Sequence, residues 1–146
     1  MASSFTTNYG IEKITTGEQS GTWGTTTNYN VDILDRIASY TAVALADAST
    51  ATLTVRAASP TDGSDNVQNG MYRVIKFTGT LSQNCTVTIA PSTTTAFFMI
   101  QNATSGGYSV IMAQGSAAAT VTVATTKAQI VYCDGSDEVV SVSDKL

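Results

Sequence analysis

Three acidic residues near the end of the chain, Asp134, Asp137 and Glu138, come closest to a catalytic set. A pair of carboxylates is the arrangement that hydrolyses glycosidic bonds, with one group as the acid and the other as base or nucleophile. Here Asp134 begins the dipeptide Asp134-Gly135, which is typical of a tight hairpin turn, and the other two acids follow it. We therefore expect them on a solvated hairpin tip, where little desolvation can raise a pKa, and we predict no catalytic residue.

A second candidate is the segment Asp62-Gly63-Ser64-Asp65-Asn66, which places hard oxygen ligands around a glycine, as calcium loops do. It lacks the spacing and the terminal bidentate glutamate of an EF-hand. Aspartate and asparagine are also ordinary turn residues. The segment therefore predicts a turn and no metal site.

The two cysteines, Cys85 and Cys133, lie 48 residues apart, and neither belongs to a Cys-x-x-Cys pair. Each lies inside an apolar run. We expect two buried thiols that behave as small hydrophobic side chains, with a disulfide between neighbouring strands as the alternative.

The 146-residue chain has no histidine, and it has 7 Lys and Arg residues compared with 11 Asp and Glu residues. The lack of histidine excludes Ser-His-Asp and Cys-His catalysis and every His-ligated metal site. A net charge of −4 argues against a surface that attracts phosphates, so nucleic acid is not an expected partner. We expect a protein that is not an enzyme and that needs no cofactor or metal ion.

Charged residues make up only 12% of the chain, against about 25% in an average globular protein. Hydroxyl side chains replace them: the sequence has 25 threonines and 15 serines. Together with valine and isoleucine, threonine favours strands, because β-branched side chains suit a pleated, half-buried surface. The length of the chain predicts one domain. No run of 18 apolar residues occurs, so we expect no membrane span. The N-terminus lacks the pattern of a secretory signal.

Residues 1–28 are polar and irregular, and we expect them to be disordered or to form an extended arm laid on another surface. Residues 29–40 place Val31, Leu34, Ile37 and Ala38 on one face of a helix. That face suits either a lid on the rest of the chain or the seam of a three-helix bundle. The only tryptophan, Trp23, lies between Gly21 and Gly24 in the arm, where it could anchor the arm in a partner's pocket or pack on its own chain.

Residues 41–146 form short apolar runs separated by polar turns. The expected strands are Thr41–Ala46, Thr52–Ala57, Met71–Thr80, Cys85–Ile89, Ala96–Gln101, Tyr108–Met112, Thr120–Val123, Ala128–Cys133 and Glu138–Val142. The first two could form a hairpin or two edge strands. The run from Ala96 to Gln101 is continuously apolar, which predicts a strand buried on both faces. This spacing predicts a mainly β fold: an antiparallel β-sandwich preceded by an extended N-terminal arm and one short helix.

Two segments resemble tail-fibre and related structural proteins of tailed bacteriophages, particularly marine ones. The first is GEQSGTWGTTTNYN, residues 17–30, which fits the pattern G-E-x-S-G-T-W-G-x-x-T-N-x-N before a short helix. The second runs from FTGTLSQNCTVTI, residues 77–89, through FMIQNAT, residues 98–104, to VYCDG, residues 131–135. It is similar to the β-module that follows in the same proteins.

This resemblance implies a non-enzymatic virion protein, assembled in the host cytoplasm as a trimer and exposed on the particle. Because the sequence ends at Leu146, soon after the β-module, we expect a short tail-fibre or fibre-adaptor type of protein, with capsid decoration (cement) as the alternative. Its partners would be other tail or capsid proteins, and its partner-binding residues would be Trp23, Gly21, Gly24, Val31, Leu34 and Ile37. A further alternative is a carbohydrate-binding module that meets a host glycan on an aromatic shelf of Tyr29, Tyr40, Tyr72, Tyr108 and Tyr132, with Asn102.

Overall fold

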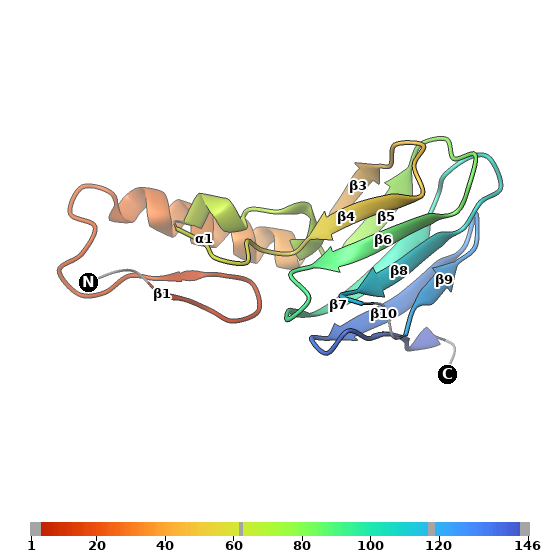
Figure 1. Cartoon of the computed structure of the whole chain (residues 1–146). Coiled ribbons are helices and arrows are strands. Elements are labelled where there is room, and N and C mark those ends of the chain that lie inside the picture. The colour runs from red at the N-terminus through yellow and green to blue at the C-terminus, as the bar shows by residue number, and fades with distance from the viewer. Residues whose placement is uncertain (1–3, 62, 117–118, 144–146) are drawn as a thin grey trace.

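The computed structural model describes residues 4–61, 63–116 and 119–143. Two packed β-sheets form one end of the molecule, and a helix with a small hairpin extends from them at the other end (Figure 1). The elements in chain order are β1 (Ser4–Phe5), β2 (Glu12–Lys13), α1 (Trp23–Ile37), β3 (Tyr40–Ala44), β4 (Thr50–Thr54), the 3₁₀ turns η1 (Gly63–Asn66) and η2 (Asn69–Met71), β5 (Val74–Thr78), β6 (Cys85–Ala90), β7 (Thr95–Asn102), β8 (Val110–Gln114), β9 (Val121–Val123), β10 (Ala128–Asp134) and β11 (Val139–Ser141).

The mainly β class with one helix is confirmed, but the purely antiparallel sandwich is wrong. One sheet has five strands in the order β11-β10-β7-β5-β3, and the other has four in the order β4-β6-β8-β9. Strands β3, β5 and β7 run parallel to one another, as do β4, β6 and β8. Only β9, β10 and β11 join their sheets by antiparallel pairing.

The parallel pairing arises because the chain alternates between the sheets from β3 to β8. Each connection crosses from one sheet to the other, and we call such a connection a corner. The backbone of one corner lies directly against the backbone of the preceding one. Gly79 and Gly106 have φ values of +113° and +104°. A Cβ on Gly79 would lie 2.5 Å from the Leu45 carbonyl oxygen, and one on Gly106 would lie 1.9 Å from that of Leu81. Glycine supplies both the positive φ and the space, so a glycine-rich break marks a corner here.

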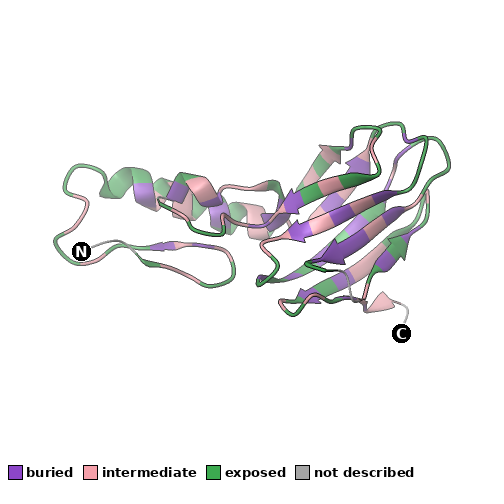
Figure 2. Cartoon of the chain, viewed as in Figure 1, coloured by how far each residue is buried: buried purple, intermediate pink, exposed green. Residues whose placement is uncertain are grey.

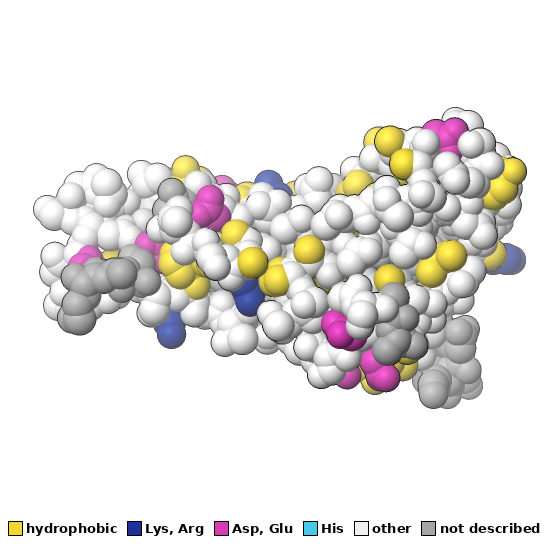
Figure 3. Space-filling view, viewed as in Figure 1, with side chains coloured by type: hydrophobic (Ala, Val, Ile, Leu, Met, Phe, Trp, Pro, Cys, Tyr) yellow, Lys and Arg dark blue, Asp and Glu magenta, His cyan; other side chains and the backbone are white. Residues whose placement is uncertain are grey.

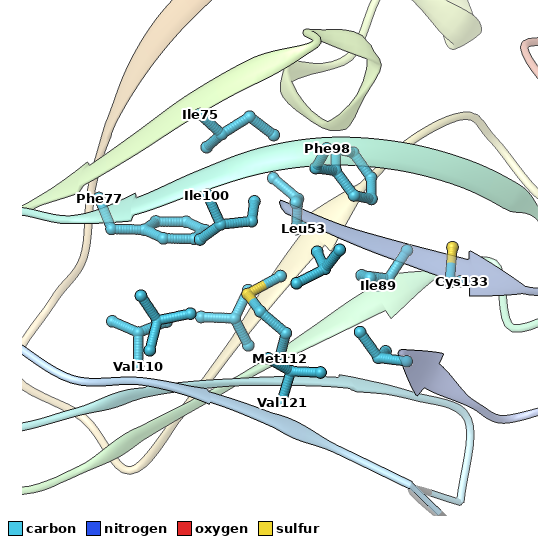
Figure 4. Close-up of a cluster of buried hydrophobic side chains, with 14 of the residues drawn as sticks. Leu53, Ile75, Phe77, Ile89, Phe98, Ile100, Val110, Met112, Val121 and Cys133 are labelled. Carbon is cyan, nitrogen blue, oxygen red and sulfur yellow. The ribbon is translucent and has the colours of Figure 1, made fainter. Parts of the chain in front are cut away.

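The core lies between the two sheets, where side chains from both point toward one another (Figure 4). Strand β6 alternates between buried and half-buried residues, as its sequence predicted (Figure 2). Strand β7 alternates too, and this corrects the prediction of burial on both faces. Phe98 and Ile100 are buried, whereas Phe97 and Met99 are 40% and 42% exposed. The sequence could not show this because β7 is apolar on both sides.

Several smaller predictions are settled by the sheets. Strands β3 and β4 are both edge strands, one in each sheet, and do not form a hairpin. The turn at Asp134-Gly135 does join an antiparallel pair, β10 and β11. Cys85 and Cys133 are buried and free. Among the described residues, no helix is long and apolar enough to cross a membrane.

The N-terminal region differs from the predicted arm. Strands β1 and β2 pair as a hairpin, and α1 begins at Trp23 and ends at Ile37, whereas the sequence predicted a helix over residues 29–40. The helix starts early because tertiary contacts hold its first turns. The hydroxyl of Thr26, which is buried, donates to the side chain of Gln19, and Gln19 in turn donates to Glu12 of β2. Threonine has a low helix propensity, so the local sequence gave no sign of these turns.

The hairpin also fixes this region to the sandwich. The buried Asn66 amide donates to the Gly10 carbonyl oxygen (2.8 Å) and accepts the N–H of Ala57 (3.1 Å). At the neighbouring corner, the Thr94 hydroxyl donates to the Asn8 carbonyl oxygen (3.1 Å). The hairpin is therefore held on its own chain and is not a free arm.

Candidate assembly interface

The side of α1 that faces the hairpin is clamped to its own chain. The Asn30 side chain accepts the N–H of Glu12 and donates to the Glu12 carbonyl oxygen, both at 2.9 Å. Ile33 is 0% exposed on the same side of the helix. Arg36 lies over the Tyr72 ring, 5.3 Å from its centroid. These contacts fix the rotation of α1 about its axis and decide which side of it faces solvent.

A second side of α1, next to the clamped one, carries a row of small and apolar residues that extends to the C-cap Ala38 and that we call the helix stripe. It consists of Trp23, Gly24, Thr27, Val31, Leu34 and Ala38. Trp23 is 62% exposed, and Val31 and Leu34 are each 56% exposed. From Gly24 to Ala38 the residues follow one another at alternating steps of three and four, the spacing of a coiled-coil seam. Exposed apolar residues at this spacing on a fixed helix form a surface suited to another helix.

The predicted helix face is divided by the structure. Val31 and Leu34 lie on the exposed side, so they form no lid over the sandwich within one chain. Ile37 is half-buried, nearer to the side that Ile33 occupies. The predicted face did not include Ile33, which is the residue that the hairpin side buries. Periodicity could not decide this because the helix has two apolar sides.

The predicted anchor, Trp23, is the first residue of α1 and does not lie in an irregular arm. Gly21, with φ +85°, ends the turn before the helix N-cap Thr22. Gly24 lies inside the first turn, and a Cβ there would meet nothing within 4 Å. Trp23 thus lies at the start of the helix, 62% exposed, with open space beside Gly21 and Gly24.

Two of the acidic candidates make hydrogen bonds within the fold. The Asp134 carboxylate accepts the N–H of Ser136 (2.8 Å), and Asp137 accepts the hydroxyl of Ser116 (3.0 Å). The first bond lies within the turn that joins β10 and β11, and the second connects this turn to the loop after β8. Within the described residues, no group of three or more His, Cys, Asp or Glu side chains could hold a metal ion.

The segment that was compared with calcium loops and predicted to be a turn is a 3₁₀ turn from Gly63 to Asn66. Asp62 lies outside the described residues. The Asp65 carboxylate accepts both the N–H (2.7 Å) and the hydroxyl (2.8 Å) of Thr61. The Asn66 side chain donates to the Gly10 carbonyl oxygen of the hairpin, as described above. The oxygens that could bind a cation are therefore used within the fold.

The predicted aromatic shelf does not assemble as proposed. Asn102 is fully buried, and its Nδ2 donates to the carbonyl oxygens of Tyr108 (3.0 Å) and Val123 (2.9 Å). Tyr72 packs against the core. Of the other tyrosines, Tyr40 and Tyr132 are exposed on the outer face of the five-stranded sheet. Phe97 and Met99, the neighbours of Tyr132 on that face, were not predicted to be exposed, because β7 is apolar at every position from Ala96 to Ile100.

Comparison of the chain with protein families, with curated proteins and with solved structures finds no match. The feature with the clearest chemistry is an apolar stripe on a helix whose other side is fixed.

Proposed function

We propose that the chain is a non-enzymatic structural protein of a tailed-phage virion, of the short tail-fibre or fibre-adaptor type, which assembles as a homotrimer on the outside of the particle. The resemblance of residues 17–30 and of the β-module to phage tail-fibre proteins supports the class. The helix stripe supports assembly, and it is the observation that carries the proposal. Val31 and Leu34 are both more than half exposed on a helix that cannot rotate to bury them.

Packing three copies of α1 around one axis would bury Val31 and Leu34 of the helix stripe and leave Trp23 exposed at the start of the helix. Full burial of a valine or leucine side chain is worth about 1.5–3 kcal/mol. Because each side chain is already partly covered in one chain, its gain in the seam is about 1 kcal/mol. Over three helices Val31 and Leu34 together contribute about 6 kcal/mol in favour of the seam, and the other contacts between the copies must supply the rest of the association free energy.

The trimer is tested by sedimentation equilibrium of the purified chain over a range of concentrations. The wild type should have the mass of three chains, and Leu34→Asp should be monomeric because it would bring three carboxylates together in an apolar seam. The matched control is Asn28→Asp, which adds the same charge on the polar, exposed side of the same helix. A monomeric wild type would overturn the trimer, and a trimeric Leu34→Asp protein would overturn the helix seam.

The virion assignment needs a test on particles. Immunogold labelling with an antibody against the chain should mark the tail of the phage that encodes it. Labelling of the head instead would favour the decoration alternative, and unlabelled particles would refute the virion assignment. Trp23→Ala should leave the circular dichroism spectrum and the trimer mass unchanged while reducing the label, because the exposed ring is the anchor that we assign to a neighbouring virion protein.

A further inference from the structure

The first turns of α1, residues 23–28, have little local support for a helix. Their sequence is WGTTTN, and glycine, threonine and asparagine have low helix propensities. The N-cap residue Thr22 makes no side-chain hydrogen bond to the helix, and the first turn has no acidic side chain. The usual contributions of a cap and of a charge near the helix dipole are therefore missing. Residues 23–28 depend on contacts from outside the helix.

These turns also bury very little. Thr26 is the only buried residue of the six, and four of the others are exposed. Figure 3 shows the end of the molecule where α1 begins, at the left of the view, and its surface there is mostly uncharged polar side chains and backbone. A segment with one buried side chain has little hydrophobic burial to hold it in place. The hydrogen bonds of the preceding turn must therefore fix residues 23–28.

Those hydrogen bonds meet at Gln19. Its backbone carbonyl oxygen accepts the N–H groups of Thr22 and Trp23, both at 2.9 Å, which joins the turn to the start of the helix. Its side-chain Oε1 accepts the hydroxyl of Thr26, and its Nε2 donates to the Glu12 carboxylate in β2. We call the side-chain bonds from Glu12 through Gln19 to Thr26 the Gln19 bridge. The bridge connects the hairpin to the one buried residue of the first helical turns.

The backbone of Gln19 lies in an unfavourable conformation. Its φ is +58°, in the left-handed region, which a residue with a side chain adopts at a cost. The same turn has glycines at both sides, Gly17 and Gly21, and each of them also has a positive φ. Position 19 nevertheless holds a residue with a long amide side chain. A costly conformation at a place where glycine would fit more easily indicates that the side chain itself is needed there.

The hairpin end of the bridge is a buried carboxylate. Glu12 is 5% exposed, and within the described part of the chain its Oε2 has no hydrogen-bond partner. Gly63 lies beside this oxygen, where an added Cβ would be 3.4 Å away. Gln19 therefore supplies the hydrogen bond that the Glu12 carboxylate accepts at its other oxygen. Because a buried carboxylate without a donor is strongly unfavourable, the closed bridge is favoured over the open one.

We propose that Gln19 is the positioning residue for Trp23: the Gln19 bridge holds residues 23–28 in the helix, and when the bridge opens these residues leave the helix while the rest of α1 stays folded. The remaining helix keeps its own contacts, because the Asn30 side chain bonds to the hairpin backbone and Ile33 is buried. It is close to the helix over residues 29–40 that the local sequence predicts. The direction of the Trp23 ring thus depends on the bridge, and the use of that ring in the virion rests on the proposed anchor.

Amide hydrogen exchange of the purified chain tests the bridge. Gln19→Glu puts a second carboxylate against Glu12, so exchange over residues 23–28 should become at least about tenfold faster, while residues 31–37 and strand β10 keep their rates. The double variant Glu12→Gln/Gln19→Glu exchanges the amide and the carboxylate between the two positions. The amide can then donate to the carboxylate, which also accepts the Thr26 hydroxyl. This double variant should therefore return the exchange of residues 23–28 to the wild-type rate.

The matched control is Gln83→Glu, the same change at an exposed corner of the sandwich, which should leave every rate unchanged. A Gln19→Glu protein that exchanges like the wild type over residues 23–28 would overturn the bridge, and so would a double variant that stays fast. Faster exchange along the whole of α1 would show that the helix opens as one unit, which contradicts separate first turns. These results do not depend on the particle: if the bridge holds but Trp23→Ala leaves the immunogold label unchanged, the positioning role stands and the anchor is wrong.

Discussion

Replacing Asn102 by alanine is expected to destabilise the folded chain by about 4 kcal/mol. Four hydrogen bonds meet on this fully buried amide. Its Nδ2 donates to the carbonyl oxygens of Tyr108 and Val123, as described above. Its Oδ1 accepts the N–H (3.1 Å) and the hydroxyl (2.6 Å) of Thr104. The side chain thus links the end of β7 to the loop before β8 and to the end of β9.

The magnitude follows from the number of bonds and from their burial. A hydrogen bond contributes about 1 kcal/mol net, so four of them give about 4 kcal/mol. Alanine offers no replacement donor or acceptor, and water has little access to the two carbonyl oxygens at a fully buried site. Unpaired buried groups cost more than the mean bond gains, so the loss should not be smaller than this sum suggests.

The matched control is Asn84→Ala, which removes the same amide from an exposed position. Asn84 makes one bond of this kind: its Oδ1 accepts the N–H of Ser109 at 2.9 Å. Water can replace that partner, so the expected cost is about 0.5–1 kcal/mol. Both variants lose an asparagine amide in a loop or strand end of the same sandwich, so their difference isolates burial and bond number.

Urea unfolding followed by far-ultraviolet circular dichroism measures both variants. Trp23 lies on α1, away from the sheets, so its fluorescence is a poor probe of the sandwich. With a slope of about 2 kcal/mol per molar urea, Asn102→Ala should lower the midpoint by about 2 M, and Asn84→Ala by less than about 0.5 M. All proteins must be compared at one concentration because association stabilises the folded state. Equal midpoints for the two variants would refute the argument.

Two further predictions concern the corners and the thiols. Gly106→Ala should destabilise the chain far more than Gly107→Ala by the same urea assay: both glycines have positive φ, but a Cβ on Gly106 would overlap the Leu81 carbonyl oxygen whereas one on Gly107 would meet nothing within 4 Å. The second variant then shows only the cost of a left-handed alanine, about 1–2 kcal/mol, and an equal loss in both would contradict the stacked corners. Burial raises the pKa of the Cys85 and Cys133 thiols, so the stability that these groups contribute is complete below their unfolded pKa of about 8.5 and is lost as pH rises toward the folded value. The free energy of unfolding should therefore fall between pH 7 and pH 9.5 in the wild type and fall less in the double variant Cys85→Ala/Cys133→Ala; parallel pH profiles would argue against this reasoning.

Local patterns in the sequence identified most of the strands. Alternation along Cys85–Ile89 placed a strand with one buried face, and Asp134-Gly135 placed the turn between β10 and β11. These features depend on the alternation of side chains along a strand and on the residue types in a turn, and both can be recognised within about ten consecutive residues. The hydroxyl-rich composition also agrees with the outer face of the four-stranded sheet, because a threonine hydroxyl can hydrogen-bond to water without carrying a charge.

The candidate interface was predicted only in part. Val31, Leu34 and Trp23 were singled out from the sequence, and all three are exposed on one chain. Which side of α1 would be buried was not predictable, because Ile33 gives the helix a second apolar side and the choice depends on a hairpin that comes from residues 4–13. The exposure of Phe97 and Met99 was not predictable because β7 is apolar at every position from Ala96 to Ile100.

The sequence by itself determined the strand-forming chemistry, the absence of histidine and the places where the chain turns. The tertiary structure alone decided which strands became neighbours and in which direction they pair. A glycine-rich break specifies a change of direction, but whether it becomes a hairpin or a corner depends on the surface that the following strand can bury. For Gly79 and Gly106 that surface is the opposite sheet, and the preceding corner, with the carbonyl oxygens of Leu45 and Leu81, leaves room for no larger residue.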